Sequence, residues 1–338
     1  MEEETIDNLL KWAKTNNIPE DDGRVVWYGE EHKIPAGFPK TKDKILSMEV
    51  LNLSRFGLKE IPQEIYSLSN LKYINLTENK LKYLPDGIAS LKLLEELDLS
   101  ENQFENLPDD LVQLKKLKSL KIDENKFKKF PEVVSKLINL TYLYAGHNNF
   151  NIFPSEVFEL TKLKSVGLAK CDINVIPSEI ENLNNLYYLD ISNNNIKRLP
   201  SELCRLKKLE ELDVSENQID VLPKEISSLI KLTILNLSNN LLENIPNEIG
   251  NLKKLKELML YGNKIKTLPK ELCELRLVDG CDVDDNPIET LPKECEVMIK
   301  KEKLHNLPPY GYENGKLKLL SNAELIQKYI YGKFKNKD

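Results

Sequence analysis

Apolar residues recur along most of this chain with a spacing that predicts a short strand followed by a short helical turn. In the stretch 209–223, LEELDVSENQIDVLP, Leu212 and Val214 stand two residues apart, and Leu209 stands three residues before Leu212. Side chains two residues apart in a strand point to the same side, so Leu212 and Val214 face a core and Asp213 faces outward. The predicted strand is therefore buried on one face and free on the other.

The residues after this strand predict a change of direction and a helical turn. Pro223 fixes its own backbone dihedral and suits the first position of a short helix. Glu225 then lies in the first turn, where the helix dipole favours a carboxylate. Ile226 and Leu229 are three residues apart and place an apolar face on the core. Because one unit buries only one side, stacking of units must create the core.

This unit recurs with a period of 23 residues. Its proline is repeated without insertion or deletion at Pro62, Pro85, Pro108, Pro131, Pro154, Pro177, Pro200, Pro223, Pro246, Pro269 and Pro292. Its asparagine is repeated at Asn79, Asn102, Asn125, Asn148, Asn194, Asn217, Asn240, Asn263 and Asn286, with Cys171 in one place. We expect each asparagine to satisfy backbone groups of the turn after its strand, so that the copies stack into a ladder. Cys171 can replace one rung because a thiol is a small, weak donor that tolerates burial.

Each unit reads LPxEIxxLxxLxxLxLxxNxI, which resembles the leucine-rich repeats of intracellular Ras-group scaffolds, Erbin-like proteins and many bacterial proteins. The resemblance covers residues 45–298. It implies an α/β fold: a right-handed solenoid of eleven repeats, with a curved parallel sheet on the concave side and short helical or 3-10 turns on the convex side. Capping elements would close both ends. The resemblance implies recognition of another protein and does not specify which one.

Three segments are therefore expected: an N-terminal helical cap at 1–44, the solenoid at 45–298 and a C-terminal hairpin-helix cap at 299–338. In the first segment, Ile6, Leu9, Leu10 and Ala13 are spaced as one face of a short helix. An open solenoid exposes core at each end, which favours a cap over the alternative of a docking arm.

The last segment predicts a hairpin and a helix. A two-residue turn at Asn314-Gly315 would pair Glu313 with Lys316, Tyr312 with Leu317 and Tyr310 with Leu319. Ser321 and Glu324 then form a capping-box pattern before an apolar stretch that ends near Gly332. The segment from Ile299 onward carries nine Lys and four acidic residues, so a basic tail could contact an acidic surface, or simply be a solvated cap.

Composition narrows the function classes. The formal net charge is −6, which argues against nucleic acid as the partner. No apolar run is long enough to cross a membrane, and MEEETIDNLLKW lacks the features of a secretory signal. Five cysteines, at Cys171, Cys204, Cys273, Cys281 and Cys295, follow no flanking-cap pattern, so we expect reduced thiols in a cytoplasmic protein, or in the host cytoplasm if it is a secreted effector.

The outward residues of the predicted strands are free to vary, so apolar residues there indicate a binding surface. We predict partner binding on the concave face through Tyr142, Tyr144, His147, Lys170, Tyr187, Tyr188, Ile234, Met259 and Tyr261. The tyrosines surround small residues at Gly146, Gly167 and Ala169, which predicts a shallow basin. Tyrosine and methionine are typical of interface centres. Acidic residues such as Glu96 and Asp213 flank them, which favours a partner with apolar anchors and a basic rim.

No motif for catalysis, cofactor or metal binding is present. P-loop, Rossmann and zinc spacings are absent, and His32, His147 and His305 are scattered. The run Asp282, Asp284, Asn286 lacks the glycine and glutamate of an EF-hand, which leaves only a looser cation site at Asp279, Asp282, Asp284 and Asp285 as an alternative. We therefore predict no catalytic residues, no cofactor and no metal.

Three functions remain as hypotheses. The first is an intracellular recognition or scaffold module in signalling, which binds a protein partner on its concave face. The second is a bacterial effector that acts on a host protein; only about 40 residues follow the repeats, too few for the catalytic region of a ubiquitin-ligase effector. The third, which the absence of motifs disfavours, is an enzyme hidden in the repeats.

Overall fold

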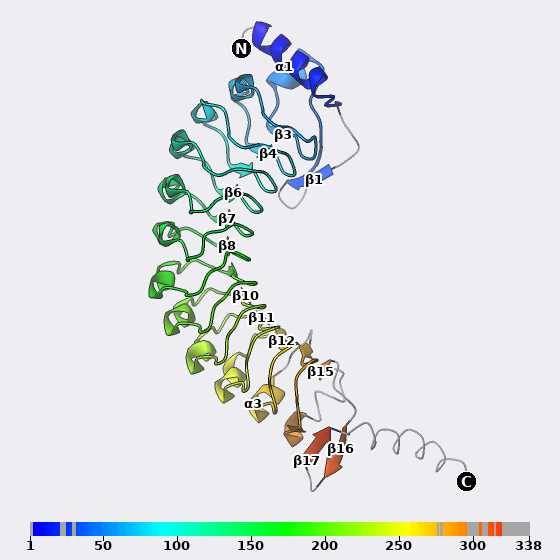
Figure 1. The fold of residues 1–338 in the computed structure, drawn as a ribbon, viewed down its shortest axis with the longest axis vertical. Coiled ribbons are helices and arrows are strands. Elements are labelled where there is room, and N and C mark those ends of the chain that lie inside the picture. Colours follow the sequence, from blue (N-terminus) through cyan, green and yellow to red (C-terminus); the bar gives the residue numbers. More distant parts are fainter. Residues whose placement is uncertain are drawn as a thin grey trace, which may run out of the picture. The chain divides into compact units, whose positions relative to one another are not determined.

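The computed structural model describes residues 3–20, 25–28, 32–275, 277, 280–295, 304–305, 310–313 and 316–319. The chain divides into two compact units, residues 1–173 and 174–338. In each unit, short parallel strands line one side and short helices line the opposite side (Figure 1). The outward side chains of the parallel strands, with the residues that directly follow them, form what we call the strand face of each unit.

The first unit opens with α1 (Glu3–Thr15), the antiparallel pair β1 (Val25–Tyr28) and β2 (His32–Pro35), and α2 (Lys42–Leu46). Its parallel strands are β3 (Val50–Asn52), β4 (Tyr73–Asn75), β5 (Glu96–Asp98), β6 (Ser119–Lys121), β7 (Tyr142–Tyr144) and β8 (Ser165–Gly167). Its 3-10 helices are η1 (Gln63–Ser67), η2 (Ile88–Ser90), η3 (Asp109–Gln113), η4 (Glu132–Lys136) and η5 (Ser155–Glu159).

The second unit continues the same alternation. Its parallel strands are β9 (Tyr188–Asp190), β10 (Glu211–Asp213), β11 (Ile234–Asn236), β12 (Glu257–Met259), β13 (Gly280–Asp282) and β15 (Leu304–His305). Its helices are η6 (Ser178–Asn182), η7 (Ser201–Arg205), η8 (Lys224–Ser228), η9 (Asn247–Asn251), α3 (Lys270–Cys273) and η10 (Lys293–Cys295). A separate antiparallel sheet joins β14 (Thr290–Leu291), β17 (Lys316–Leu319) and β16 (Tyr310–Glu313).

The predicted alternation of buried and outward residues is confirmed. Leu212 and Val214 are buried, whereas Asp213 between them is half-buried on the strand face. Leu212 pairs in register with Leu189 on one side and Leu235 on the other, so equivalent leucines of successive repeats stack directly. This stacking supplies the core that no single repeat can form.

The asparagine ladder is also confirmed. The Asn217 side-chain amide donates to the carbonyl oxygens of Ile191, Val214 and Ser215 over 3.0, 3.1 and 3.0 Å. Its Oδ1 accepts the backbone N–H of Ile196 at 3.0 Å. One side chain thus satisfies four backbone groups of two consecutive repeats.

Cys171 fills its rung in the predicted way. Its thiol is buried and donates to the carbonyl oxygens of Ala145 at 3.5 Å and Ala169 at 3.4 Å. These carbonyls lie 26 and two residues before Cys171, which are the same offsets at which Asn148 donates to Ile122 and Gly146. The Cys171 thiol therefore makes two of the hydrogen bonds that an asparagine amide makes at the equivalent position of other repeats.

Most of the repeat prolines lie one residue earlier than predicted, at the N-cap, whereas the η2 helix after Pro85 has Gly87 as its N-cap. Pro223 is the N-cap of η8, with φ −67° and ψ 140°, and the helix begins at Lys224. The carbonyl oxygen of Pro223 accepts the N–H of Ile226 at 3.0 Å, which closes a 3-10 turn. Proline suits this place because it has no N–H to leave unpaired. Glu225 lies in the first turn, as predicted.

The prediction of five reduced thiols is wrong for one pair. Cys273 and Cys295 form a disulfide with their Cα atoms 4.7 Å apart. They lie in α3 and η10, the helical turns of consecutive repeats, and stacking of the two turns brings them together. Cys171, Cys204 and Cys281 are buried and lie outside this disulfide.

The structure describes elements near both ends of the chain, in the segments where caps are predicted. Ile6, Leu9 and Ala13 are the buried residues of α1. The C-terminal hairpin has the predicted register, with Tyr312 opposite Leu317, Glu313 opposite Lys316 and Tyr310 opposite Leu319. The predicted helix from Ser321 to Gly332 lies outside the described residues. The segment boundaries 1–44, 45–298 and 299–338 stay predictions.

Candidate functional site

The predicted tyrosines of the first unit lie on its strand face. Tyr142 and Tyr144 are the first and last residues of β7, and both are half-buried. The Tyr144 ring lies against Gly167, where a Cβ atom would be only 2.8 Å from its Cδ1. Its hydroxyl forms a 2.7 Å hydrogen bond with the Ser165 hydroxyl. The predicted basin over Gly167 is therefore wrong, because the ring of Tyr144 fills it.

The hollow lies on the other side of these rings. It has a volume of about 510 Å³ and is lined by Glu96, Ser119, Lys121, Asp123, Tyr142 and Tyr144. We call it the tyrosine groove. The serine on β6 is small and buried, so it leaves space between the tyrosines of β7 and the glutamate of β5. The sequence contains a signal for this hollow. At the first position of three consecutive strands, the small Ser119 lies between Glu96 and Tyr142.

The lining of the tyrosine groove includes the half-buried carboxyl group of Asp123. Asp123 accepts the N–H of Gly146 at 2.8 Å and the hydroxyl of Ser100 at 3.4 Å. Burial raises the pKa of Asp123 to about 6, although the hydrogen bond from Gly146 acts in the opposite direction. Gly146 is needed there, since a Cβ atom would be 2.9 Å from the Ala169 carbonyl oxygen.

One further carboxyl group and one amine line the groove. Burial raises the pKa of Glu96, the first residue of β5. The Lys121 amine lies 3.5 Å from a carboxylate oxygen of Asp98. The one cation of the lining is thus engaged with a neighbouring strand, which leaves the groove acidic.

His147 and Lys170 are exposed, and their backbones have φ of 53°. They belong to a column in which each repeat places the residue before its ladder position in the left-handed region, at Arg55, Glu78, Glu101, Glu124, His147, Lys170, Asn193, Glu216, Asn239, Gly262 and Asp285. Sequence reasoning missed this column, because only the glycine and the few Asn and Asp residues in it signal a positive φ.

The remaining predicted residues belong to the second unit. Tyr188 and Ile234 start β9 and β11, and Glu211 of β10 pairs between them. Met259 ends β12 and is half-buried. The exposed fractions are 36% for Tyr187 and 39% for Tyr261, the highest among the predicted aromatic residues. Apart from Tyr187, which precedes β9, the structure thus places the predicted contact residues on strand faces, one group in each unit.

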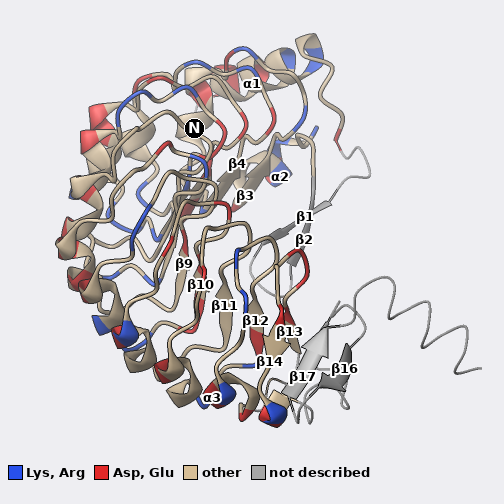
Figure 2. Cartoon of the chain, turned by 60° about the horizontal axis from the view of Figure 1, so that its bottom comes forward, with Lys and Arg blue, Asp and Glu red and all other residues tan. Residues whose placement is uncertain are grey.

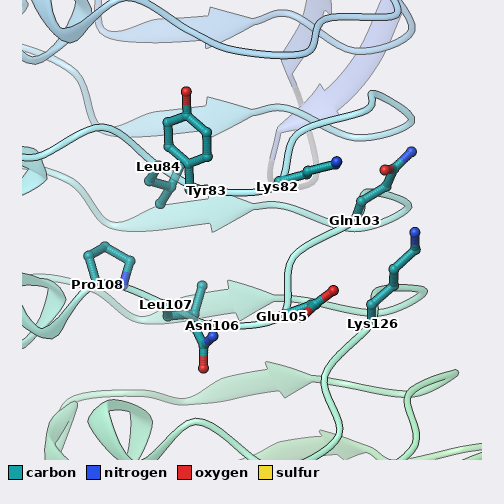
Figure 3. A pocket seen from close by; sticks show the side chains of 9 residues that line it. All are labelled: Lys82, Tyr83, Leu84, Gln103, Glu105, Asn106, Leu107, Pro108 and Lys126. Carbon is teal, nitrogen blue, oxygen red and sulfur yellow. The ribbon is translucent and has the colours of Figure 1, made fainter.

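A second hollow of the first unit was not predicted. It has a volume of about 540 Å³ and lies beside the segments that lead from strands to helices. Tyr83, with 56% of its surface exposed, stands at this hollow, and the ends of Lys82, Gln103 and Lys126 lie at the end away from Pro108 (Figure 3). This surface provides an exposed tyrosine away from the strand face.

Charged residues also occur outside the strand faces. Figure 2 shows acidic residues, in red, on the short helices at the edge of the cartoon, in agreement with Glu156, Glu179 and Glu202 in first turns. Carboxylates in the first turn interact favourably with the positive end of the helix dipole, which gives these residues a structural role. Within the residues that the structure describes, no group of three or more His, Cys, Asp or Glu side chains is placed to hold a metal ion.

Comparisons with known proteins agree with the geometry. Models of the leucine-rich repeat region match residues 43–163 and 147–235, and a leucine-rich repeat model matches residues 220–288. The chain belongs to the leucine-rich repeat family, and the predicted right-handed solenoid fold is confirmed. No curated protein matches the sequence.

Several solved structures are similar. A leucine-rich-repeat protein of Leptospira interrogans is 39% identical over 75% of this chain and 70% of its own, with a TM-score of 0.66. The plant peptide hormone receptor RGFR1 in complex with RGF2 is 28% identical over 73% of this chain and 46% of its own, with a TM-score of 0.59. The functional domain of InlJ from Listeria monocytogenes, which includes a cysteine ladder, shares the fold at 23% identity, 73% and 51% coverage and a TM-score of 0.61. Among the described helices, none is long and apolar enough to span a membrane.

Proposed function

We propose that this chain is a protein-recognition module that binds a protein or peptide partner on its strand face. The observation that carries the proposal is the position of Tyr142 and Tyr144, which lie half-buried on a strand face where the core does not require them. Aromatic residues in such a place bury a large area at low entropic cost when a partner covers them.

The scaffold behind these side chains supports the proposal. The asparagine ladder fixes the turns that follow the strands, so the strand face is rigid before a partner arrives. The similar plant receptor was solved in complex with RGF2, which is consistent with recognition of a peptide by this fold. A scaffold or signalling role is the finer form of this proposal. We propose no enzymatic activity, because the groove offers carboxylates and tyrosines without a nucleophile-base pair.

The experiment is affinity capture from cell lysate. Wild type is compared with the triple variant Tyr142→Ala, Tyr144→Ala, Tyr188→Ala, and with Tyr83→Ala as a control that removes an exposed tyrosine away from the strand face. Circular dichroism verifies equal folding. We expect a protein that wild type and Tyr83→Ala retain and the triple variant loses. Equal capture by all three would contradict the proposal.

A second candidate is a bacterial protein that acts on a host protein. The 39% identity with the Leptospira interrogans protein favours this source without naming a target. This second candidate is tested by repeating the affinity capture with animal cell lysate and with bacterial lysate and comparing the proteins retained. A tyrosine-dependent partner found only in bacterial lysate would contradict it.

Location and the basic tail are separate questions. The sequence favours a cytoplasmic protein, whereas the Cys273–Cys295 disulfide is typical of an oxidising compartment. We therefore propose that the protein functions in an oxidising compartment, where the Cys273–Cys295 bond remains intact. Alkylation of free thiols in the source cells before lysis tests this proposal. If Cys273 and Cys295 are recovered in alkylated form, the bond is reduced in the cell and the cytoplasmic location is favoured instead. Contact of the tail from Ile299 with an acidic surface stays a prediction.

A further inference from the structure

The tyrosine groove also indicates what chemistry the partner brings. Resting on the proposed function, we propose that this groove receives an arginine side chain of the partner, with Asp123 as the carboxylate acceptor and the Tyr142 ring as a wall. The proposal combines an open groove, aromatic rings and unpaired acidic groups at one place in the first unit.

The charges of the groove are unbalanced. In the described part of the chain, neither Glu96 nor Asp123 forms an ion pair, and the one lining amine, Lys121, is engaged with Asp98 at 3.5 Å. Lys121 lowers the pKa of both Glu96 and Asp123, but burial has the larger effect on each. Carboxylates held partly away from water without a cation in contact are costly, and a cation from outside relieves that cost. Charge complementarity therefore favours a cationic group over a neutral or anionic one.

Asp123 has bonding capacity left for such a group. A carboxylate offers about four acceptor positions, and the N–H of Gly146, the hydroxyl of Ser100 and the backbone N–H of Asp123 itself use three of them. The raised pKa of Asp123 shows that these hydrogen bonds do not offset its burial. A guanidinium could therefore add a hydrogen bond without displacing existing ones.

The rings favour arginine over lysine. Guanidinium is planar, stacks on aromatic faces and is less strongly hydrated than an ammonium group. Tyr144 is held by its hydrogen bond to Ser165 and by contact with Gly167, so that ring is fixed before binding. Tyr142, whose neighbour in register on β6 is Ser119, is the ring with space beside it. A planar cation that enters the groove over Ser119 meets this ring.

The alternative is that these carboxylates are only a solvated acidic surface that attracts any cation. The chain provides a matched control for this alternative. Asp284 lies seven repeats after Asp123 at the same repeat position, but it is exposed. Asp284→Asn removes the same charge as Asp123→Asn without touching the groove.

The test is fluorescence anisotropy of a fluorescein-labelled peptide with alternating glycine and arginine, at about physiological salt, where diffuse attraction is screened. A peptide with citrulline in place of arginine keeps the shape and removes the charge. We expect the arginine peptide to bind at least tenfold more tightly than the citrulline peptide. Asp123→Asn should weaken arginine-peptide binding at least fivefold, and Asp284→Asn less than twofold. Tyr142→Leu, which keeps bulk but removes the ring, should also weaken it.

Equal binding of the two peptides, or equal effects of the two Asp→Asn variants, would overturn the proposal. The partner found by capture separates this failure from failure of the proposed function. If the triple tyrosine variant loses the partner while Asp123→Asn and Tyr142→Leu bind both the partner and the arginine peptide as wild type does, strand-face recognition stands and the arginine site is rejected. If the tyrosine variant also keeps the partner, both proposals fail.

Discussion

The amide of Asn217 donates a 3.0 Å hydrogen bond to the carbonyl oxygen of Ile191, a residue 26 positions earlier in the preceding repeat. The bond joins the turn of one repeat to the strand end of the preceding repeat. It recurs at the same offset for Asn240 and Val214 and for Asn263 and Leu237. The repeats are therefore held together by side-chain bonds as well as by stacked leucines.

Asn217→Ala should lower the free energy of unfolding by about 1–3 kcal/mol, because buried backbone groups lose their partner. Chemical denaturation measures the change. Asn251→Ala, at an exposed position that ends η9, is the matched control and should change the midpoint little. An unchanged midpoint for Asn217→Ala would refute the ladder's role in stability.

Asp123→Asn should stabilise the protein at pH 7.5 by about 1–3 kcal/mol relative to wild type, and this advantage should shrink as the pH falls to about 4.5. The folded-state pKa, about 6, is above the ordinary aspartate value of 3.8, so the folded protein holds this proton more tightly than the unfolded chain. Wild type therefore gains stability, relative to the variant, as pH falls through 6.

Denaturation of both proteins across this pH range measures the difference. Asp98 and Lys121, the charged groups that act on Asp123, are present in both proteins and largely cancel. A pH-independent difference would show that Asp123 titrates normally.

Gly167→Ala should cost about 1–3 kcal/mol of stability and weaken partner binding, because the new methyl group meets the Tyr144 ring at 2.8 Å. A double-mutant cycle isolates the cause. Once Tyr144→Ala has removed the ring, adding Gly167→Ala should cost little more. Additive costs in the cycle would mean that the ring does not lie over Gly167.

Denatured, unreduced protein should take up three equivalents of iodoacetamide, and reduced protein five, because Cys273 and Cys295 are joined. The native protein should react slowly, since burial raises the pKa of the Cys204 thiol to about 12 and that of Cys281 further. Intact mass gives the count. Reduction should lower stability by about 2–4 kcal/mol at the C-terminal repeats. Five equivalents without reductant would exclude the bond.

Much of the fold was predictable, because the constant 23-residue spacing determines which residues of successive repeats stack on one another. Leu212, Asn217 and Glu225 occupy the places that their spacing predicts. The disulfide was not predictable, since pairing of Cys273 with Cys295 depends on how two helical turns stack. Single-residue shifts such as Pro223 at the N-cap lie within the usual uncertainty of helix ends.

The sequence predicted which face of the repeats carries the candidate site, but not where on that face the groove lies. The spacing identifies Tyr142 and Tyr144 as outward, but side-chain direction decides where the hollow lies. Tyr144 turns onto Gly167 and bonds Ser165, so the groove opens toward Glu96 instead. The hydrogen bond that half-buried Asp123 accepts from Gly146 is likewise not revealed by the periodicity.

The most direct test of strand-face recognition is the dissociation constant for the captured partner, measured by isothermal titration calorimetry for three proteins. Wild type is compared with the triple variant Tyr142→Ala, Tyr144→Ala, Tyr188→Ala and with Tyr83→Ala. We predict that the triple variant binds at least tenfold more weakly than wild type and that Tyr83→Ala stays within twofold. Equal affinity of the triple variant and wild type, or a greater loss for Tyr83→Ala, would contradict recognition on the strand face.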